Sequence, residues 1–477
     1  MSRFKPGISE PRSSLLHSSY SAPVSTQAAP VLSSLATKPE PPKSFEPVRP
    51  QAPHRPNMFE SLGFWSFCIY QISASLTDLL TRFLGRIYVS TVALIAVPIF
   101  WLFSTTRFRA LRHPMGRWWA AFAILLIIDL PFSVWRHGTF DMLVNYIPRS
   151  YLILFYITAF ALSFERCRTL MHVGIIAASA ELFIAVKFGG YSEDGRYRVT
   201  DSIFAGNSNG LAMMLLLGAI TLSFLFYEKG IFKKLYAAMA MTVSVIYILR
   251  TGSRGCLLAA ICYAALIFVL SRQKMITLAL ALVFGVVGVA TVPSLAMGRL
   301  MLLFSSAPTT DASAVQSQEQ RVILLKRSLL ETVKHPLFGV GPEQFAVAVA
   351  GEKLKRGEYA PWLGTHNSFT QVSSECGIPA FVCYCAVIFY SLRLNYRLLK
   401  ASRKYPEYAK FEGFAATLLS SMMVYCICTF FFHMAYTGTL PGIAGLTLAV
   451  HYAAQEAMGE DYATVFAGRS PRRLARA

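Results

Sequence analysis

The chain has 477 residues, of which 54% are hydrophobic and only 15% are charged, and its formal net charge is +20. Soluble domains carry about a quarter of charged residues, so this composition excludes an ordinary soluble protein. A transmembrane β-barrel is also excluded, because apolar runs such as 276–292 do not alternate between apolar and polar residues. The basic residues gather at the ends of the apolar runs, which is typical of membrane topology rather than of nucleic-acid binding.

Residues 1–57 differ from the rest of the chain, because proline, serine and alanine dominate them. Such a segment cannot bury enough apolar surface to offset the entropy of ordering it, so we predict that it is disordered. It lacks the apolar core of a secretory signal peptide, and its lysines and arginines favour the cytoplasm. Residues 457–477 are predicted to form a second, basic cytoplasmic tail.

The apolar runs between the tails predict an all-α integral membrane protein with about twelve transmembrane helices, since about 20 apolar residues cross the hydrocarbon core. Most of these helices fall within residues 58–293, and the last ones fall within residues 377–456. The predicted spans are 59–77, 86–104, 118–135, 149–164, 171–188, 204–227, 235–250, 256–271, 275–293, 377–393, 413–436 and 440–456.

Basic residues occur in alternate loops between these spans, and such loops stay in the cytoplasm. Both termini are therefore expected in the cytoplasm. The predicted inner loops are 107–117, 165–168, 228–234, 271–274 and 393–410. The predicted outer loops are 136–148, 189–203, 250–255, 294–376 and 437–440.

The outer loop 294–376 is long for a simple tether, and loops of this length are often functional. It begins with a predicted helix at 318–334 that carries Arg321, and a turn rich in glycine and proline follows at 335–342. The loop closes with His366 and Asn367 and runs through Glu375 into the next predicted span. A binding or catalytic site is therefore expected in this loop.

Further arginines lie in two other predicted outer segments. Arg196 and Arg198 belong to the loop 189–203, and Arg254 belongs to the tight turn 250–255. A guanidinium group binds two phosphate oxygens at once, so arginines together with a histidine indicate a site for a phosphorylated, membrane-held substrate.

The motifs in these segments resemble the O-antigen ligase and polymerase superfamily, which comprises bacterial lipid-linked glycan ligases and exopolysaccharide polymerases. The resemblance covers about residues 190–395. Ser208 and Ala380 depart from it, because the family often has proline and glycine at these positions. The motifs that carry the resemblance are Arg321, the run 335–341, His366-Asn367, Glu375-Cys376-Gly377, and the upstream runs 206–212 and 251–255.

The resemblance implies a metal-independent, inverting glycosyltransferase without a cofactor, at the periplasmic face of a bacterial inner membrane. Its donor would be a glycan on a polyprenyl diphosphate such as undecaprenyl diphosphate. In the ligases the acceptor is the lipid A core of lipopolysaccharide, and in the polymerases it is another lipid-linked repeat. Ligases that glycosylate proteins are a third relative, so the sugar and the acceptor stay open.

The resemblance also implies roles for individual residues. Arg321, followed by Leu325, falls on the arginine of an Arg-x-x-x-Leu pattern, and His366 falls on the histidine of a His-Asn pattern. The earlier outer arginine corresponds to Arg198, with Arg196 as the alternative. These arginines, with Arg254, would stabilise the diphosphate leaving group.

His366 would accept the proton of the attacking hydroxyl, because the pKa of histidine is ordinarily near neutrality. Asn367 or Glu375 would orient it.

A transporter or flippase for lipid-linked sugars is the alternative from another class. Asp129, Glu181 and Lys187 lie within predicted spans, where ionisable groups are costly and often functional. Against this reading, one long outer loop dominates the sequence, and no repeated halves of the kind common in transporters are recognisable.

Overall fold

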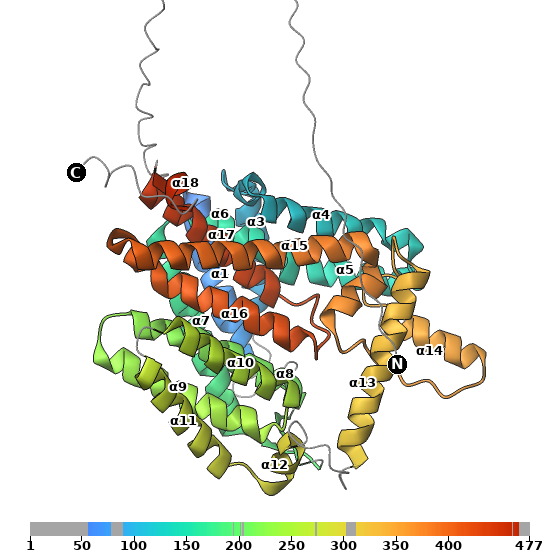
Figure 1. Cartoon of the computed structure of the whole chain (residues 1–477). Helices are drawn as coiled ribbons and strands as arrows, with labels where there is room; N and C mark the ends of the chain where they lie inside the picture. Colours follow the sequence, from blue (N-terminus) through green and yellow to red (C-terminus); the bar gives the residue numbers. More distant parts are fainter. Residues whose placement is uncertain are drawn as a thin grey trace, which may run out of the picture. The chain divides into compact units, whose positions relative to one another are not determined.

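The computed structural model describes residues 56–77, 89–193, 195–200, 202, 205–271, 274–301, 312–459 and 461–466. These residues form α-helices with one short β-hairpin (Figure 1). The tail predicted to be disordered, residues 1–57, lies almost entirely outside the described residues, as does most of the basic tail 457–477.

The first helices lead to the hairpin, in which β1 (Gly189–Tyr191) pairs antiparallel with β2 (Tyr197–Val199). Before the hairpin lie α1 (Met58–Ser75), α3 (Val89–Phe103), α4 (Pro114–Ile128), α5 (Arg136–Tyr146), α6 (Ile153–Phe160) and α7 (Phe164–Phe188). After it lie α8 (Ser208–Leu222), α9 (Ile231–Arg250), α10 (Arg254–Leu270), α11 (Lys274–Ala290) and α12 (Ser294–Met301). The last helices are α13 (Ala312–Lys334), α14 (Phe345–Lys355), α15 (Ser368–Lys404), α16 (Glu412–Thr429), α17 (Thr439–Met458) and α18 (Asp461–Phe466).

Six helical segments among the described residues are long and apolar enough to cross a membrane. Each overlaps a predicted span, so the structure supports a multi-pass helical membrane protein, while the count of twelve stays a prediction. The six segments are Pro114–Phe132, Phe164–Phe188, Ser208–Tyr227, Ile231–Arg250, Ser368–Lys404 and Pro406–Thr429.

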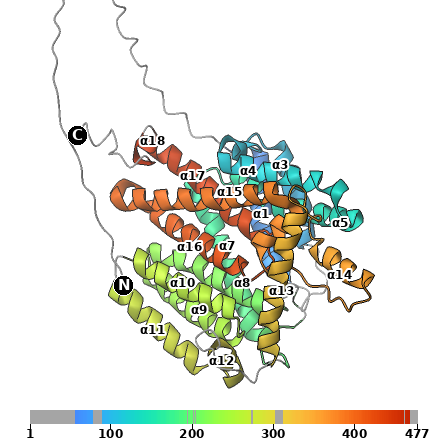
Figure 2. The same cartoon turned by 45° about the vertical axis from the view of Figure 1, so that its right-hand side comes forward.

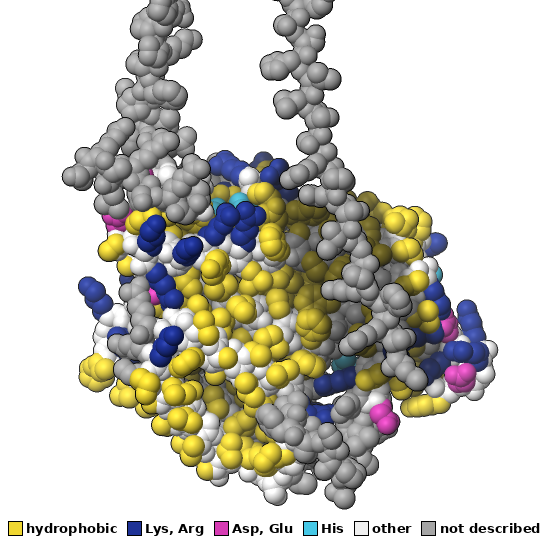
Figure 3. Space-filling model, viewed as in Figure 1, with side chains coloured by type: hydrophobic (Ala, Val, Ile, Leu, Met, Phe, Trp, Pro, Cys, Tyr) yellow, Lys and Arg dark blue, Asp and Glu magenta, His cyan; other side chains and the backbone are white. Residues whose placement is uncertain are grey.

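The surface agrees with a lipid-facing bundle. Large apolar side chains such as Trp65, Val92 and Phe183 are exposed. Figure 3 shows hydrophobic side chains over most of one face, with lysine and arginine side chains gathered toward its edges. In a protein that water surrounds, an exposed apolar surface of this extent would be unfavourable.

Helix α15 organises the C-terminal part of the bundle, because it packs against α4, α13, α16 and α17. Helix α16 in turn packs against α8 and α10. Figures 1 and 2 both place α13 beside the first part of α15 and away from α17 and α18. The two ends of α15 therefore belong to different regions of the bundle.

Several predicted helix boundaries differ from the structure, among them those of the spans 149–164 and 413–436. The span predicted at 149–164 is preceded by α5, and a π-helical segment (Ile147–Tyr151) joins α5 to α6. Pro148 lies in that segment and has no amide hydrogen, so it disrupts the regular α-helical hydrogen bonds. The span predicted at 413–436 ends earlier, because α16 stops at Thr429.

The turn at residues 335–342 fits into a break in α15. The break lies at Gly377, whose φ is 78°. The turn bonds to both sides of it, since Val340 N donates to Ser374 O (2.9 Å) and Ile378 N donates to Pro336 O (2.8 Å). Backbone groups that the break leaves unpaired are thereby satisfied. The two glycine-containing motifs of the sequence form one structural unit.

Gly339→Ala is expected to destabilise this unit. Gly339 has a φ of 62°, and a Cβ atom there would lie 2.2 Å from the carbonyl carbon of Glu375. Neither the backbone strain nor the steric clash can relax without moving α15, so the free energy of unfolding is expected to fall by about 3 kcal/mol or more. A melting curve of the purified protein measures it. The control is Gly351→Ala on α14, where a Cβ meets nothing within 4 Å; equal melting temperatures for the two variants would contradict the expectation.

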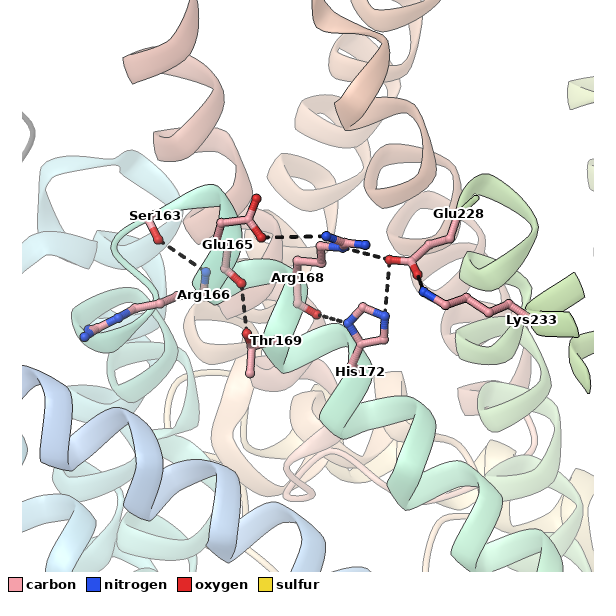
Figure 4. Close-up of polar contacts among 8 residues, drawn as sticks. All are labelled: Ser163, Glu165, Arg166, Arg168, Thr169, His172, Glu228 and Lys233. Carbon is pink, nitrogen blue, oxygen red and sulfur yellow. Dashed lines mark hydrogen bonds and ion pairs between the residues drawn. The ribbon is translucent and has the colours of Figure 1, made fainter. Parts of the chain in front are cut away.

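A buried carboxylate joins α7 to the start of α9 at a predicted inner loop (Figure 4). Glu228 accepts hydrogen bonds from Arg168 Nε (2.8 Å) and from Lys233 Nζ, and it lies 3.2 Å from His172 Nε2. Burial alone would raise the pKa of Glu228, but hydrogen bonds from Arg168 and Lys233 and the proximity of His172 lower it to about 2. The ionised form therefore stabilises the folded protein.

This shift predicts a pH dependence of stability. The pKa of Glu228 is about 2 in the folded protein and ordinarily 4.5, so its contribution is full above pH 4.5 and disappears as the pH falls toward 2. The melting temperature is expected to fall over that window, and Glu228→Gln is expected to lower it at pH 7 and to reduce the dependence. The matched control is Glu165→Gln, because Glu165 is 74% exposed and lies 3.8 Å from Arg168. An unchanged pH dependence in Glu228→Gln would show that other groups cause it.

Candidate active site

A cavity of 360 Å³ forms where the beginning of α10, the middle of α13 and the loop before α15 meet. Four residues singled out in the sequence line it, namely Arg254, Arg321, His366 and Asn367. They come from three separate segments, since Arg321 follows Arg254 by 67 positions and His366 follows Arg321 by 45, so only the fold brings them together. The remaining lining residues are Gly255, Leu258, Val322, Leu325, Thr365, Phe430 and Phe431.

The two arginines give this cavity a positive charge. Burial and the nearby Arg254 both lower the pKa of Arg321, which shows that the two cations repel each other. No described lining residue is a carboxylate, and within the described chain Arg321 forms no hydrogen bond or ion pair. Two guanidinium groups that line one cavity form a candidate site for an anion such as a diphosphate.

The N-terminus of α10 adds to the positive electrostatic potential of the cavity. Arg254 is its first residue, and the N-cap residue Ser253 makes no side-chain hydrogen bond to the helix. The first amides of a helix carry partial positive charge and bind anions when no side chain caps them. The helix N-terminus and both guanidinium groups thus favour negative charge in one cavity.

His366 has an unusual backbone. Its φ is 51°, a backbone conformation that residues other than glycine rarely adopt. The next residue fixes this geometry, because the Asn367 side chain caps α15 by accepting from Phe369 N (2.9 Å) and Thr370 N (3.1 Å). Asn367 therefore supports His366 through the backbone.

The imidazole of His366 is uncharged at neutral pH. Burial, the neighbouring His433 and Arg321 lower its pKa to about 4. The two histidine rings meet edge to face, with their centroids 5.1 Å apart. A neutral imidazole in a site for anions is able to accept a proton from a hydroxyl group.

His433 is the residue that the sequence interpretation missed. It was predicted to lie inside the span 413–436, but α16 ends before it and the chain turns back over α15. Ser368 fixes this turn, because its Oγ donates to Phe432 O (2.7 Å) and accepts from Met434 N (2.8 Å). The polar residue within an apolar run was the only sequence signal for it.

Arg196 and Arg198 do not line this cavity. Arg196 donates to Thr251 O (3.0 Å) and to Asn209 Oδ1 (2.6 Å), so it supports the turn before Arg254. Arg198 is exposed in the middle of β2, whereas its neighbours Tyr197 and Val199 are buried. Alternation along the strand directs its side chain away from the body of the protein.

Glu375 lies in another set of contacts. Its carboxylate accepts hydrogen bonds from Tyr436 Oη (2.8 Å), Glu343 N (2.9 Å) and Phe345 N (3.4 Å). These bonds fix the beginning of α14 and the turn at 335–342. None of these partners is His366, so the orienting role expected for Glu375 has no direct contact to carry it.

The ionisable residues that suggested a transporter lie apart from the cavity. Asp129 is buried, and neither of its oxygens has a hydrogen-bond partner among the described residues. Glu181 accepts from Ser75 Oγ (3.1 Å), and Lys187 is exposed in the last turn of α7. None of the three residues is among those that line the cavity with Arg254 and Arg321.

Comparison with known proteins agrees with the motifs. Residues 239–385 match the family model described as O-antigen ligase. The matched region contains Arg254, Arg321 and His366, whereas Arg196 and Arg198 precede it. The resemblance inferred from the sequence is thus confirmed over these residues, and it supports a membrane enzyme of the O-antigen ligase or polymerase type. A search of curated proteins found no match to the chain.

Proposed function

We propose that the protein is a membrane glycosyltransferase of the O-antigen ligase type. It transfers a glycan from a polyprenyl-diphosphate carrier to a sugar hydroxyl at the periplasmic face of the bacterial inner membrane, in lipopolysaccharide or surface polysaccharide biosynthesis. The observation that carries the proposal is the cavity in which Arg254, Arg321 and the neutral His366 meet. The match to the O-antigen ligase family over residues 239–385 supports it.

The reaction is one direct displacement. The acceptor oxygen bonds to the sugar carbon while the bond from that carbon to the diphosphate oxygen breaks, so the configuration at the carbon inverts. The imidazole of His366 takes the hydroxyl proton, and the diphosphate leaves with the electron pair. Arg254 and Arg321 stabilise its charge before and after the bond breaks. The proposed reaction needs neither a metal ion nor a cofactor.

Binding of the donor would raise the pKa of His366. The diphosphate brings negative charge next to His366, and a nearby negative charge raises the pKa of a histidine. The imidazole then becomes a stronger proton acceptor only when the substrate is present. This removes the disadvantage of the low pKa of about 4 that burial and Arg321 give the free protein.

The proposed topology keeps twelve spans and both termini in the cytoplasm. Helix α15 begins at the cavity and runs through Lys404, with Arg403 and Lys404 in its last turn. The part of α15 after the break at Gly377, residues 378–404, extends for about 40 Å, which exceeds the thickness of a hydrocarbon core. Basic residues favour the cytoplasm, so the cavity at the other end faces the periplasm.

Activity should depend on pH through His366. Because the pKa of His366 is about 4 in the free protein, kcat/KM is expected to stay level at neutral pH and to fall only near pH 4. The fall in kcat should occur at a higher pH, since the bound diphosphate raises that pKa. Initial rates of glycan transfer between pH 4 and 8 measure both. Coincident profiles would contradict the coupling between donor and base.

The decisive experiment supplies the purified chain with a polyprenyl-diphosphate glycan, a lipid A core acceptor and a chelator. Transfer to the core establishes a ligase. Longer glycans that remain on polyprenyl diphosphate establish an exopolysaccharide or O-antigen polymerase, the alternative with the same donor. If neither product forms and the protein instead moves the lipid-linked sugar across liposome membranes, it is a transporter.

A further inference from the structure

A second and larger cavity lies inside the helical bundle. It measures 710 Å³ and is lined by α8, α9, α10, α11 and α16. Along α10 its lining residues run from Leu257 to Leu270, which corresponds to about 20 Å of helix. This length exceeds half of a hydrocarbon core of about 30 Å, so the cavity has room for an acyl chain of one leaflet.

Several polar residues interrupt the apolar lining, and two of them have hydroxyl groups without a described partner. The hydroxyl groups of Tyr263 and Thr417 are buried, and neither has a hydrogen-bond partner among the described residues. Ser223 lies near Tyr263, but the two hydroxyl groups do not reach hydrogen-bond geometry, and Ser223 Oγ donates to Ile220 O (2.6 Å) instead. A buried hydroxyl without a partner is unfavourable, so both groups are suited to donate to an acceptor on a bound molecule.

An ion pair lines one end of this cavity. Arg403 Nε lies 2.9 Å from Glu412 Oε1, and Arg403 Nη2 donates to Leu270 O (2.6 Å). Thr417 follows Glu412 by five positions on α16, a distance of about 8 Å along the axis. The charged pair Arg403 and Glu412 therefore lies at one end of the cavity. The hydroxyl groups lie deeper, at a separation comparable to the length of a lipid's glycerol backbone, and apolar side chains line the rest.

We propose that this cavity binds a zwitterionic glycerophospholipid of the phosphatidylethanolamine class. Its phosphate and ammonium groups lie at Arg403 and Glu412, its ester carbonyls accept from Tyr263 and Thr417, and one acyl chain fills the apolar part. A lipid with an anionic head and no ammonium group offers Arg403 a phosphate but offers the Glu412 carboxylate no cation in exchange. An isoprenoid chain has no acceptor for the two hydroxyl groups. The proposal does not depend on the glycosyltransferase activity.

Native mass spectrometry of the full chain tests this proposal. Delipidated protein in detergent is titrated with palmitoyl-oleoyl phosphatidylethanolamine, with the matching phosphatidylglycerol or with undecaprenyl phosphate. One phosphatidylethanolamine is expected to remain bound per chain, with affinity about tenfold above that of phosphatidylglycerol, which corresponds to one lost ionic contact. Preference for undecaprenyl phosphate, or equal binding of the two phospholipids, overturns the proposal.

Substitutions locate the site. Tyr263→Phe with Thr417→Val removes two hydroxyl groups and keeps the volume nearly constant, and it is expected to lower phosphatidylethanolamine binding about tenfold or more. The matched control is Tyr146→Phe, because the Tyr146 hydroxyl is also buried without a described partner but does not line this cavity. If the double variant does not stay monodisperse, Tyr263→Phe alone decides. Binding equal to that of the unsubstituted protein overturns the assignment.

Discussion

Replacing His366 with glutamine is expected to lower the rate of glycan transfer by about 10²–10⁴-fold, the range that general acid–base catalysis contributes. Glutamine keeps a polar side chain of similar reach but cannot accept the hydroxyl proton. His366 lies in the cavity with Arg254 and Arg321, so the substitution should leave donor binding largely intact. The loss should therefore appear in kcat, measured with saturating polyprenyl-diphosphate glycan.

A second histidine of the same outer region provides the control. His335 is the first residue of the turn at 335–342, and its side chain is 48% exposed and 3.8 Å from Glu331. It does not line the cavity, so His335→Gln should transfer glycan at nearly the unsubstituted rate. If His366→Gln kept that rate as well, proton transfer to His366 would not be part of the reaction.

Helix positions could be predicted from the sequence where apolar runs end in polar or glycine-containing turns. Helices α9 and α10 were predicted as 235–250 and 256–271, and the structure has Ile231–Arg250 and Arg254–Leu270. The turn between them contains Gly252, whose φ is 62°, so the chain must leave the helical conformation there. Such a signal is local and therefore readable without the fold.

Helix α15 could not be predicted in full for the opposite reason. Its first nine residues, which precede Gly377, were assigned to the outer loop. Asn367 caps this helical segment, and the turn at 335–342 bonds across the break that follows it, a contact that joins segments far apart in the sequence. The same limit applies to Pro148, where only tertiary packing decides between a helix end and a π-helical segment.

The candidate site shows the same division. Residue types and motif order predicted Arg254, Arg321 and His366, and the fold brings them into one cavity. The sequence could not show that Arg196 bonds to Thr251 and Asn209 and so supports the site only indirectly. It also gave His433 no role, because a ring contact of 5.1 Å with His366 depends on how two loops meet.

Arg321→Gln is expected to lower glycan transfer by about 10²–10³-fold, as for the loss of one preorganised group that stabilises a leaving charge. Arg321→Lys should lie between Arg321→Gln and the unsubstituted protein, because an ammonium group keeps the charge but cannot bind two phosphate oxygens in one plane. Both substitutions retain good helix formers on α13, so the helix should persist.

Thermal stability separates this role from a structural one. Arg321 and Arg254 repel each other in the free protein, and burial further disfavours the charge on Arg321. Arg321→Gln should therefore leave the melting temperature unchanged or raise it while activity falls. Lys326→Gln is the matched control, because Lys326 is exposed on the same helix outside the cavity and should change neither quantity. A joint loss of stability and activity in Arg321→Gln would instead assign Arg321 to the packing of α13. A buried cation whose role is to bind an anion lowers the stability of the free protein, so its removal alone should not lower the melting temperature.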